Sequence, residues 1–185
     1  MRHMLLTGRT IRLTGDDGSL ADRLAAHGAT IGDDCDVAVH VVATPASRTA
    51  QPIHEISAAD WATRCDDPIL AAIDAAQDAH RRKATRLLFV LPALGMTGAA
   101  ELAPLATVSE AVRSLARVAA RHWGPDGMSV SCVAVRDGGP IAHPQSLPDA
   151  TDDDVAGVIA LLSHELAFPA TGATVVVDGG VVLNP

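Results

Sequence analysis

The sequence predicts an α/β fold in which a mostly parallel sheet of about five strands is flanked by helices. Short runs rich in Val, Ile and Leu alternate along the chain with longer amphipathic runs, which is the pattern of parallel strands joined by crossover helices. Only 2% of the 185 residues are aromatic although 48% are hydrophobic, so the core has to be built from Ala, Val, Leu and Ile. The length is typical of one domain, residues 1–185.

Five runs have the composition of strands. In chain order they are residues 10–13, 36–43, 86–91, 128–135 and 174–177. The second run reads DVAVHVVA and is apolar at successive positions, as expected of a parallel strand that is buried on both faces. This run should therefore lie inside the sheet, with helices on both sides of it.

Helices are expected over residues 20–27, from 57 onward, over 68–82, over 98–122 and from 151 onward. Ser57 and Thr151 are each followed three residues later by an aspartate, which is the spacing of a capping box. Asp67 and Pro68 have the residue types of an N-cap and a first helical position, so the helix 68–82 is expected to begin independently of the short helix before it.

Charge and motifs argue against several classes of function. The formal net charge is −8 and Lys83 is the single lysine, so nucleic-acid binding is not expected. The eight histidines form no His-Glu-x-x-His motif, and Cys35, Cys65 and Cys132 form no Cys-x-x-Cys. We expect no metal site and three buried reduced thiols. No run approaches the ~18 apolar residues of a membrane helix, and the N-terminus has no signal-peptide core, which indicates a cytoplasmic protein with no membrane contact.

Five stretches spread along the chain resemble those of a known family. They are LLTGRTIRLTG, DVAVHVVA, SAADWATRCDDPI, WGPDGMSVSCVAV and FPATGATVVVDGG. In this order they resemble, in the short-chain dehydrogenases/reductases, the opening strand, the strand with the Asn-Asn-Ala-Gly motif, the approach to the long interface helix, the stretch before the Pro-Gly turn, and the closing strand. The resemblance implies a single degenerate, truncated Rossmann-like domain over residues 1–185. The family's second and third strands would be deleted near residues 30–35.

Two chain paths are compatible with that deletion. A direct crossover from the first strand to its new neighbour should be right-handed, which would place the first helix on the face of the sheet opposite to its family position. Alternatively, residues 29–31 form a stub strand that preserves the family's path. The sequence leaves both paths open.

The resemblance implies that the family's catalytic groups are missing. The family's proton donor is a tyrosine whose pKa is lowered by a lysine four residues later, and a serine and an asparagine complete its site. This chain contains no tyrosine. We align it with the family through Gly95, Gly98 and Trp123. The positions of the family's tyrosine, lysine, serine and asparagine then fall on Leu105, Ser109, Pro92 and Pro68. All four catalytic roles are therefore expected to be vacant.

The turn after the first strand is short and acidic, with Gly15, Asp16, Asp17 and Gly18 in succession. A dinucleotide fold uses glycines here so that backbone N–H groups can approach the pyrophosphate. Two carboxylates would oppose a pyrophosphate by ~1–4 kcal/mol for each contact at ~4 Å; alternatively, they are turn residues that complement a helix dipole. On either interpretation we expect no cofactor on this chain, and NAD or NADP on a catalytic partner.

The resemblance also implies a function within an oligomer. Members of the family contact one another through the two helices expected here at 68–82 and 98–122, and through the last helix and strand. These contacts would use Ala103, Ala106, Leu105, Val112, Val181 and Leu183. We therefore expect a non-catalytic subunit that associates with a catalytically competent homologue, or with itself, in an NAD(P)-dependent dehydrogenase/reductase. Acyl-CoA or related carbonyl and hydroxyl compounds are the substrates that the resemblance suggests.

Two other functions remain open. His40 replaces the first asparagine of the family's strand-end motif and should lie near the old cofactor cleft. The chain could be an enzyme of unrelated mechanism that uses His40 or Ser109, or a homodimer that binds a small molecule in a remodelled cleft near His40. The alternative for His40 is a buried histidine with its hydrogen bonds satisfied.

Overall fold

The computed structural model describes residues 5–15, 18–42, 47–136 and 151–180. These residues form one parallel sheet of six strands in the order β2-β1-β3-β4-β5-β6. The strands are β1 (Thr10–Thr14), β2 (Thr30–Ile31), β3 (Val37–Val41), β4 (Arg86–Pro92), β5 (Ser129–Val135) and β6 (Thr174–Val177). The expected α/β fold with a parallel sheet is confirmed, and all five expected strands are present.

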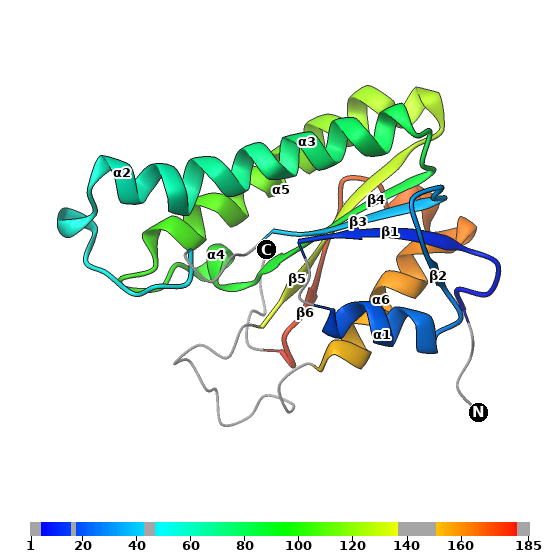
Figure 1. Cartoon of the computed structure of the whole chain (residues 1–185), viewed down its shortest axis with the longest axis horizontal. Coiled ribbons are helices and arrows are strands. Elements are labelled where there is room, and N and C mark those ends of the chain that lie inside the picture. The colour runs from blue at the N-terminus through cyan, green and yellow to red at the C-terminus, as the bar shows by residue number, and fades with distance from the viewer. Residues whose placement is uncertain (1–4, 16–17, 43–46, 137–150, 181–185) are drawn as a thin grey trace.

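Helices cover both faces of this sheet. The long helices α3 (Asp67–Arg81) and α5 (Ala103–Trp123) lie on one face, and α1 (Ser19–Ala26) and α6 (Asp152–Ser163) lie on the other (Figure 1). Successive strand residues point to opposite faces: Val37 and Val39 pack with α1 and α6, whereas Ala38 belongs to the core under α3 and α5. The near-absence of aromatic side chains is thus compensated by close packing of alanines on strands of valine and leucine.

The strand β2, which is additional to the five expected strands, resolves the path of the chain. Thr30 and Ile31 pair with Thr10 and Ile11 at the outer edge of β1, so residues 29–31 do form a stub strand. The helix between the two paired strands, α1, lies on the same face as α6 (Figure 1). The alternative of a direct crossover from β1 to β3 is therefore wrong, because the chain first visits the outer edge of β1 and then returns.

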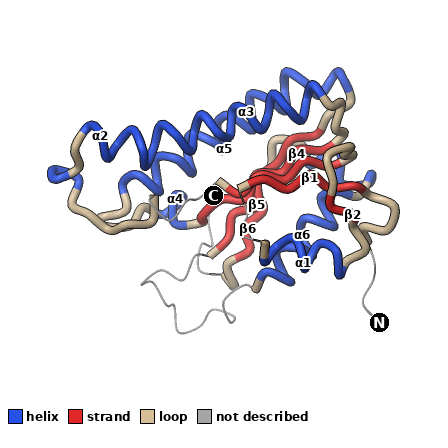
Figure 2. Tube along the Cα trace, viewed as in Figure 1, coloured by secondary structure: helices blue, strands red, loops and turns tan. Residues whose placement is uncertain are grey.

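The helical segment from Ala58 to Arg81 is continuous, which corrects one expectation. Ser57 caps α2 (Ala58–Trp61) as expected, because its Oγ accepts the N–H of Asp60 at 3.1 Å. However, α2 runs through a π-helical turn, η2 (Ala62–Asp66), directly into α3 (Figure 2). Asp67 is helical rather than an N-cap. Pro68 cannot donate a backbone hydrogen bond, and a single wide turn of this kind accommodates such a break without ending the helix.

The remaining elements are short. They are α4 (Leu94–Thr97) and the three 3-10 turns Ile53–Glu55, Gly124–Asp126 and Glu165–Ala170. Thr151 and Asp154 form the expected capping box at the start of α6. All three cysteines are free and buried, as the sequence predicted. No helix in the described ranges is long and apolar enough to cross a membrane.

Candidate functional site

Leu105 and Ser109, which align with the family's catalytic tyrosine and lysine, lie at the start of α5, beneath the short helix α4. Leu105 is 2% exposed and Ser109 is fully buried. The Ser109 hydroxyl donates a hydrogen bond to the carbonyl of Leu105 at 2.9 Å, so it is satisfied within its own helix. No nucleophile or general acid can act from this position without access to the surface.

α4 leaves no space above Ser109. A Cβ built on Gly95 would come within 2.4 Å of the Cβ and 3.0 Å of the Oγ of Ser109. A lysine side chain has four methylenes and an ammonium group, and here it would have to displace α4. The packing therefore fills the volume in which an ammonium group would have to act.

The two prolines of the expected site are also buried. Pro92 is the last residue of β4 and pairs with Val135 of β5. Pro68 lies in the first turn of α3, and the neighbouring Cys65 contacts the carbonyl of Pro104 at 3.8 Å. The structure thus brings the start of α5 close to α4 and to the π-helical turn. That the four catalytic roles are vacant remains a prediction.

The edge of the sheet that would hold a dinucleotide is incomplete. Ligands of open parallel sheets bind beyond the carboxyl ends of the strands, but β2 ends opposite Ile11, well before β1 ends at Thr14. The Gly32 N–H donates to the carbonyl of Ile11 at 3.0 Å and the Asp36 N–H to that of Thr10 at 3.0 Å, so the chain turns back there. No residue of β2 reaches the position where an acidic side chain would bind a ribose.

The turn after β1 is closed against β3. Gly15 has a φ of +77°, and a Cβ on it would lie 2.1 Å from the carbonyl oxygen of Val41. Asp16 and Asp17 lie outside the described residues, and Gly18 is the N-cap of α1 without a side-chain cap. The described residues at this edge therefore do not fit a dinucleotide, because the strand that would support its adenosine half stops short.

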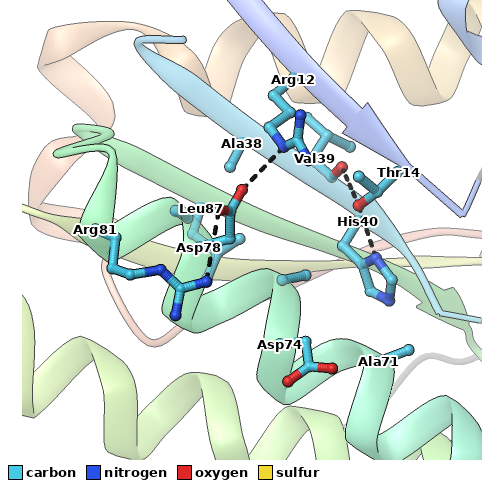
Figure 3. A pocket seen from close by; sticks show the side chains of 12 residues that line it. Arg12, Thr14, Ala38, Val39, His40, Ala71, Asp74, Asp78, Arg81 and Leu87 are labelled. Atoms are coloured by element: carbon cyan, nitrogen blue, oxygen red, sulfur yellow. Dashed lines mark hydrogen bonds and ion pairs between the residues drawn. The ribbon is translucent and has the colours of Figure 1, made fainter. Parts of the chain in front are cut away.

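A cavity of about 520 Å³ lies instead between α3 and the neighbouring strands β1 and β3 of the sheet (Figure 3). It occupies the stretch of sheet face that α3 leaves uncovered. Its lining is Arg12, Thr14, Ala38, Val39, His40, Ala71, Asp74, Ala75, Asp78, Ala79, Arg81 and Leu87. The structure thus places a cavity beside His40, which runs along the sheet face and not beyond the strand ends, where the old cofactor cleft was expected.

His40 is the buried polar group of this cavity. It is 7% exposed, and its Nδ1 lies 2.8 Å from the Thr14 hydroxyl. Its ring meets the Phe89 ring edge-on, with centroids 6.2 Å apart. Burial lowers the pKa of His40 from its ordinary 6.5 to about 4, because the charged imidazolium would lose its hydration. The imidazole is therefore neutral near pH 7.

An ion-pair network closes the opposite end of the cavity. Arg12 pairs with Asp33 and, through Nε at 3.0 Å, with Asp78. Asp78 also contacts Arg81 at 3.6 Å and Arg82 at 2.7 Å. The hydrogen bond from Arg82, followed by the charges of the three arginines, lowers the pKa of the Asp78 carboxyl. Sequence reasoning missed these residues, although polar side chains at positions 10, 12 and 14 of β1 alternate as they do on a strand with one solvated face.

Some of the residues expected at an interface are buried inside the chain, and others have exposed surface. Leu105 and Val112 are 2% and 0% exposed and lie inside the chain's own fold, so they cannot meet a partner as expected. Ala103 and Ala106 are half-buried on α5 and have surface that a partner could cover. Val181 and Leu183 lie outside the described residues.

Comparison with known proteins identifies the fold. No family model and no curated protein matches the sequence. An oxidoreductase of the short-chain dehydrogenase/reductase family from Burkholderia thailandensis superposes with a TM-score of 0.72 at 19% identity, covering 96% of this chain and 94% of that one. This chain has the short-chain dehydrogenase/reductase fold.

Two further structures with this fold contain nucleotides. The enoyl-acyl carrier protein reductase of Bacillus cereus, with NADP+ and indole naphthyridinone, has a TM-score of 0.74 at 14% identity and covers 98% of this chain and 99% of its own. A short-chain dehydrogenase of Leptospira borgpetersenii with bound NAD+ has a TM-score of 0.74 at 12% identity and covers 95% of this chain and 93% of its own. At these identities the short-chain dehydrogenase/reductase fold is established and the chemistry has to be argued from the site.

Proposed function

We propose that this chain is a non-catalytic, short-chain dehydrogenase/reductase-like subunit that associates in the cytoplasm with a catalytically competent homologue. One observation carries the proposal: Ser109, at the position of the family's lysine, is fully buried and packed against Gly95. A chain that had kept the chemistry would need an accessible proton donor at this point. Here the same volume is used for packing.

The cofactor of the complex is NAD or NADP, held by the homologue. In favour of this assignment, β2 of this chain ends before it can support a nucleotide, whereas solved structures of the same fold contain NAD+ or NADP+. Acyl-CoA or related carbonyl and hydroxyl compounds are the substrates we propose for the complex, in line with the enoyl-acyl carrier protein reductase among these structures.

The contact surface that we propose is the outward side of α5. Ala103 and Ala106 are small and half-buried, so the helix of a partner could approach this side closely. The opposite side of α5, with Val108 and Val112, is already buried in the core. One side of the helix thus stabilises the subunit and the other remains for association.

Purification from the native source tests the proposal. The chain is isolated under conditions that preserve complexes, its mass in solution is measured by light scattering, and the proteins that accompany it are identified by mass spectrometry. We expect a homologue that carries Tyr-x-x-x-Lys in stoichiometric amount, and we expect the activity of that homologue with NAD(H) or NADP(H) to fall when this chain is removed. Isolation of the chain as a monomer or homomer, with no such homologue, would overturn the proposal.

The alternative of a stand-alone enzyme has less support. Ser109 has no access to the surface. Thr14 is the hydroxyl beside His40, and it also bonds to the carbonyl of Val39 at 3.4 Å. The Thr14 hydroxyl is therefore already engaged by a main-chain carbonyl, which disfavours its activation as a nucleophile by His40.

A further inference from the structure

We propose that the cavity beside His40 is a binding site for a small uncharged molecule with a flat apolar body and one hydroxyl or N–H donor, which is directed at the Nε2 atom of His40. The site consists of residues of this chain alone. The inference therefore does not rest on the proposed subunit function, and either could fail without the other.

The direction of the hydrogen bonds defines the polar group that the cavity offers. The Thr14 hydroxyl lies 3.4 Å from the carbonyl oxygen of Val39 and 2.8 Å from Nδ1 of His40. Because a carbonyl can only accept, we assign the hydroxyl proton to the bond with Val39, and Nδ1 then donates its N–H to the Thr14 oxygen. A neutral imidazole with its proton on Nδ1 has a bare lone pair on Nε2. His40 thus presents a hydrogen-bond acceptor to the cavity.

The acceptor is held in place, and none of the described residues is a hydrogen-bond partner for it. His40 is 7% exposed and is fixed by Thr14 on one side and Phe89 on the other. Within the described ranges its hydrogen bond goes through Nδ1, and Figure 3 shows the opposite edge of the ring directed away from Thr14. Nε2 is therefore available to accept a hydrogen bond from a ligand in the cavity.

The walls of the cavity suit a flat apolar body. Small side chains dominate them: Ala38 and Leu87 come from the sheet, and Ala71, Ala75 and Ala79 come from α3. These residues leave a slot between strand and helix of about 520 Å³, which is within the range of small-molecule sites. Such sites combine apolar walls with fixed polar groups; here the alanine and leucine surface is accompanied by Thr14, His40 and four charged residues.

The charges around the cavity balance, which selects against charged ligands. Arg12 and Arg81 contribute two cations, and Asp74 and Asp78 contribute two anions. Arg12, Arg81 and Asp78 are already joined in ion pairs. An anionic ligand would have to compete with Asp78 for the arginines, and a cationic ligand with the arginines for Asp78. A neutral ligand leaves the network intact.

Two molecules of one shape test the proposal. Indole has an N–H donor, and benzofuran has a ring oxygen in its place. Each is titrated into the purified chain, and binding is followed by NMR through the ring resonances of His40. We expect saturable binding of indole with a shift of the His40 resonances, and binding of benzofuran at least tenfold weaker. Equal affinities, or no saturable binding of indole, would overturn the proposal.

Variants test the location of the site. Ala75→Leu places a larger side chain on the half-buried wall of α3 and should abolish the binding of indole; Ala71→Leu, on the exposed side of the same wall, is a second version if the first does not fold. Ala25→Leu, on α1 at the other face of the sheet, is the matched control and should leave binding unchanged. His40→Phe should remove the preference for indole over benzofuran. Binding that survives both wall variants would show that the site lies elsewhere.

Discussion

Gly95 and Ser109 are packed against each other so closely that a Cβ on Gly95 would lie 2.4 Å from the Cβ of Ser109. This contact joins α4 to the first turns of α5 at the point where the short-chain dehydrogenase/reductase fold would place its lysine, according to the sequence alignment. The contact is therefore both a packing requirement of this chain and the main argument against catalysis by it.

The first prediction concerns this contact. Gly95→Ala should destabilise the protein by about 1–3 kcal/mol, because an added methyl group cannot be accommodated without moving α4. Gly157→Ala is the matched control in α6, where a Cβ would meet nothing within 4 Å; it should stabilise the protein by about 0.5–1 kcal/mol, since alanine is the better helix former. Urea unfolding measures both. Equal free energies of unfolding for the two variants would show that α4 can move to make room for the methyl group at no cost in stability.

The second prediction concerns the catalytic pair. Restoring it as Leu105→Tyr with Ser109→Lys should create no NAD(P)H-dependent reductase, because Pro92 and Pro68 remain and the space for the lysine is filled. The double variant should also be less stable by several kcal/mol (about 3 or more), because it buries an ammonium group without a partner. The double variant Leu105→Phe with Ser109→Met, which is of similar size but uncharged, separates the cost of size from that of charge. Turnover above background by the double variant would contradict this prediction.

The third prediction concerns nucleotides. The isolated chain should bind neither NAD(H) nor NADP(H) in calorimetry, because β2 ends opposite Ile11 and the Gly15 turn is closed against Val41. The Bacillus cereus reductase, whose structure holds NADP+, serves as the positive control under the same conditions. A dissociation constant in the micromolar range, which corresponds to a binding free energy of about −8 kcal/mol, would show that the turn opens.

Much of the fold could be predicted because its signals are local. The run of successive apolar residues over 36–43, the spacing of Ser57 and Asp60, and that of Thr151 and Asp154 each predicted a feature that the structure contains. Each depends on residues that are close together in the sequence. The path of the chain after β1 was not determined in this way, because the handedness rule left both a direct crossover and a stub strand open.

The features that could not be predicted depend on contacts between distant residues. Asp67 and Pro68 have the residue types of a helix start, but the helix continues through the π-helical turn η2, which packs against α5. The cavity beside His40 exists because α3 leaves part of β1 and β3 uncovered. No single segment contains that information. The burial of Leu105 and Val112 inside the chain likewise depends on which side of α5 meets the sheet.

The fourth prediction is a pH dependence of stability that arises from His40. Its pKa is about 4 in the folded protein and 6.5 ordinarily, so between these values the unfolded chain binds more protons and the free energy of unfolding falls as the pH falls. The shift corresponds to a loss of about 3 kcal/mol over this window. Urea unfolding from pH 7 to pH 4.5 should show the slope, and His40→Phe should flatten it. His54→Gln, at an exposed histidine, should leave the slope unchanged; a slope that survives His40→Phe would assign it to another group.

The last prediction concerns association through α5. Ala103→Glu and Ala106→Glu place a carboxylate on the half-buried side of the helix, near its N-terminus, where the helix dipole tolerates negative charge. The isolated chain should therefore remain folded. In a complex the carboxylate would lose its hydration without gaining a partner, so each variant should weaken association by several kcal/mol (about 2–4). Size-exclusion chromatography with light scattering, with and without the catalytic homologue, measures the effect.

Ala25→Glu on α1, at the opposite face of the sheet, is the control and should assemble like the parent chain. If the two α5 variants assemble as well as this control, the interface lies elsewhere, and the subunit proposal loses the surface on which it depends.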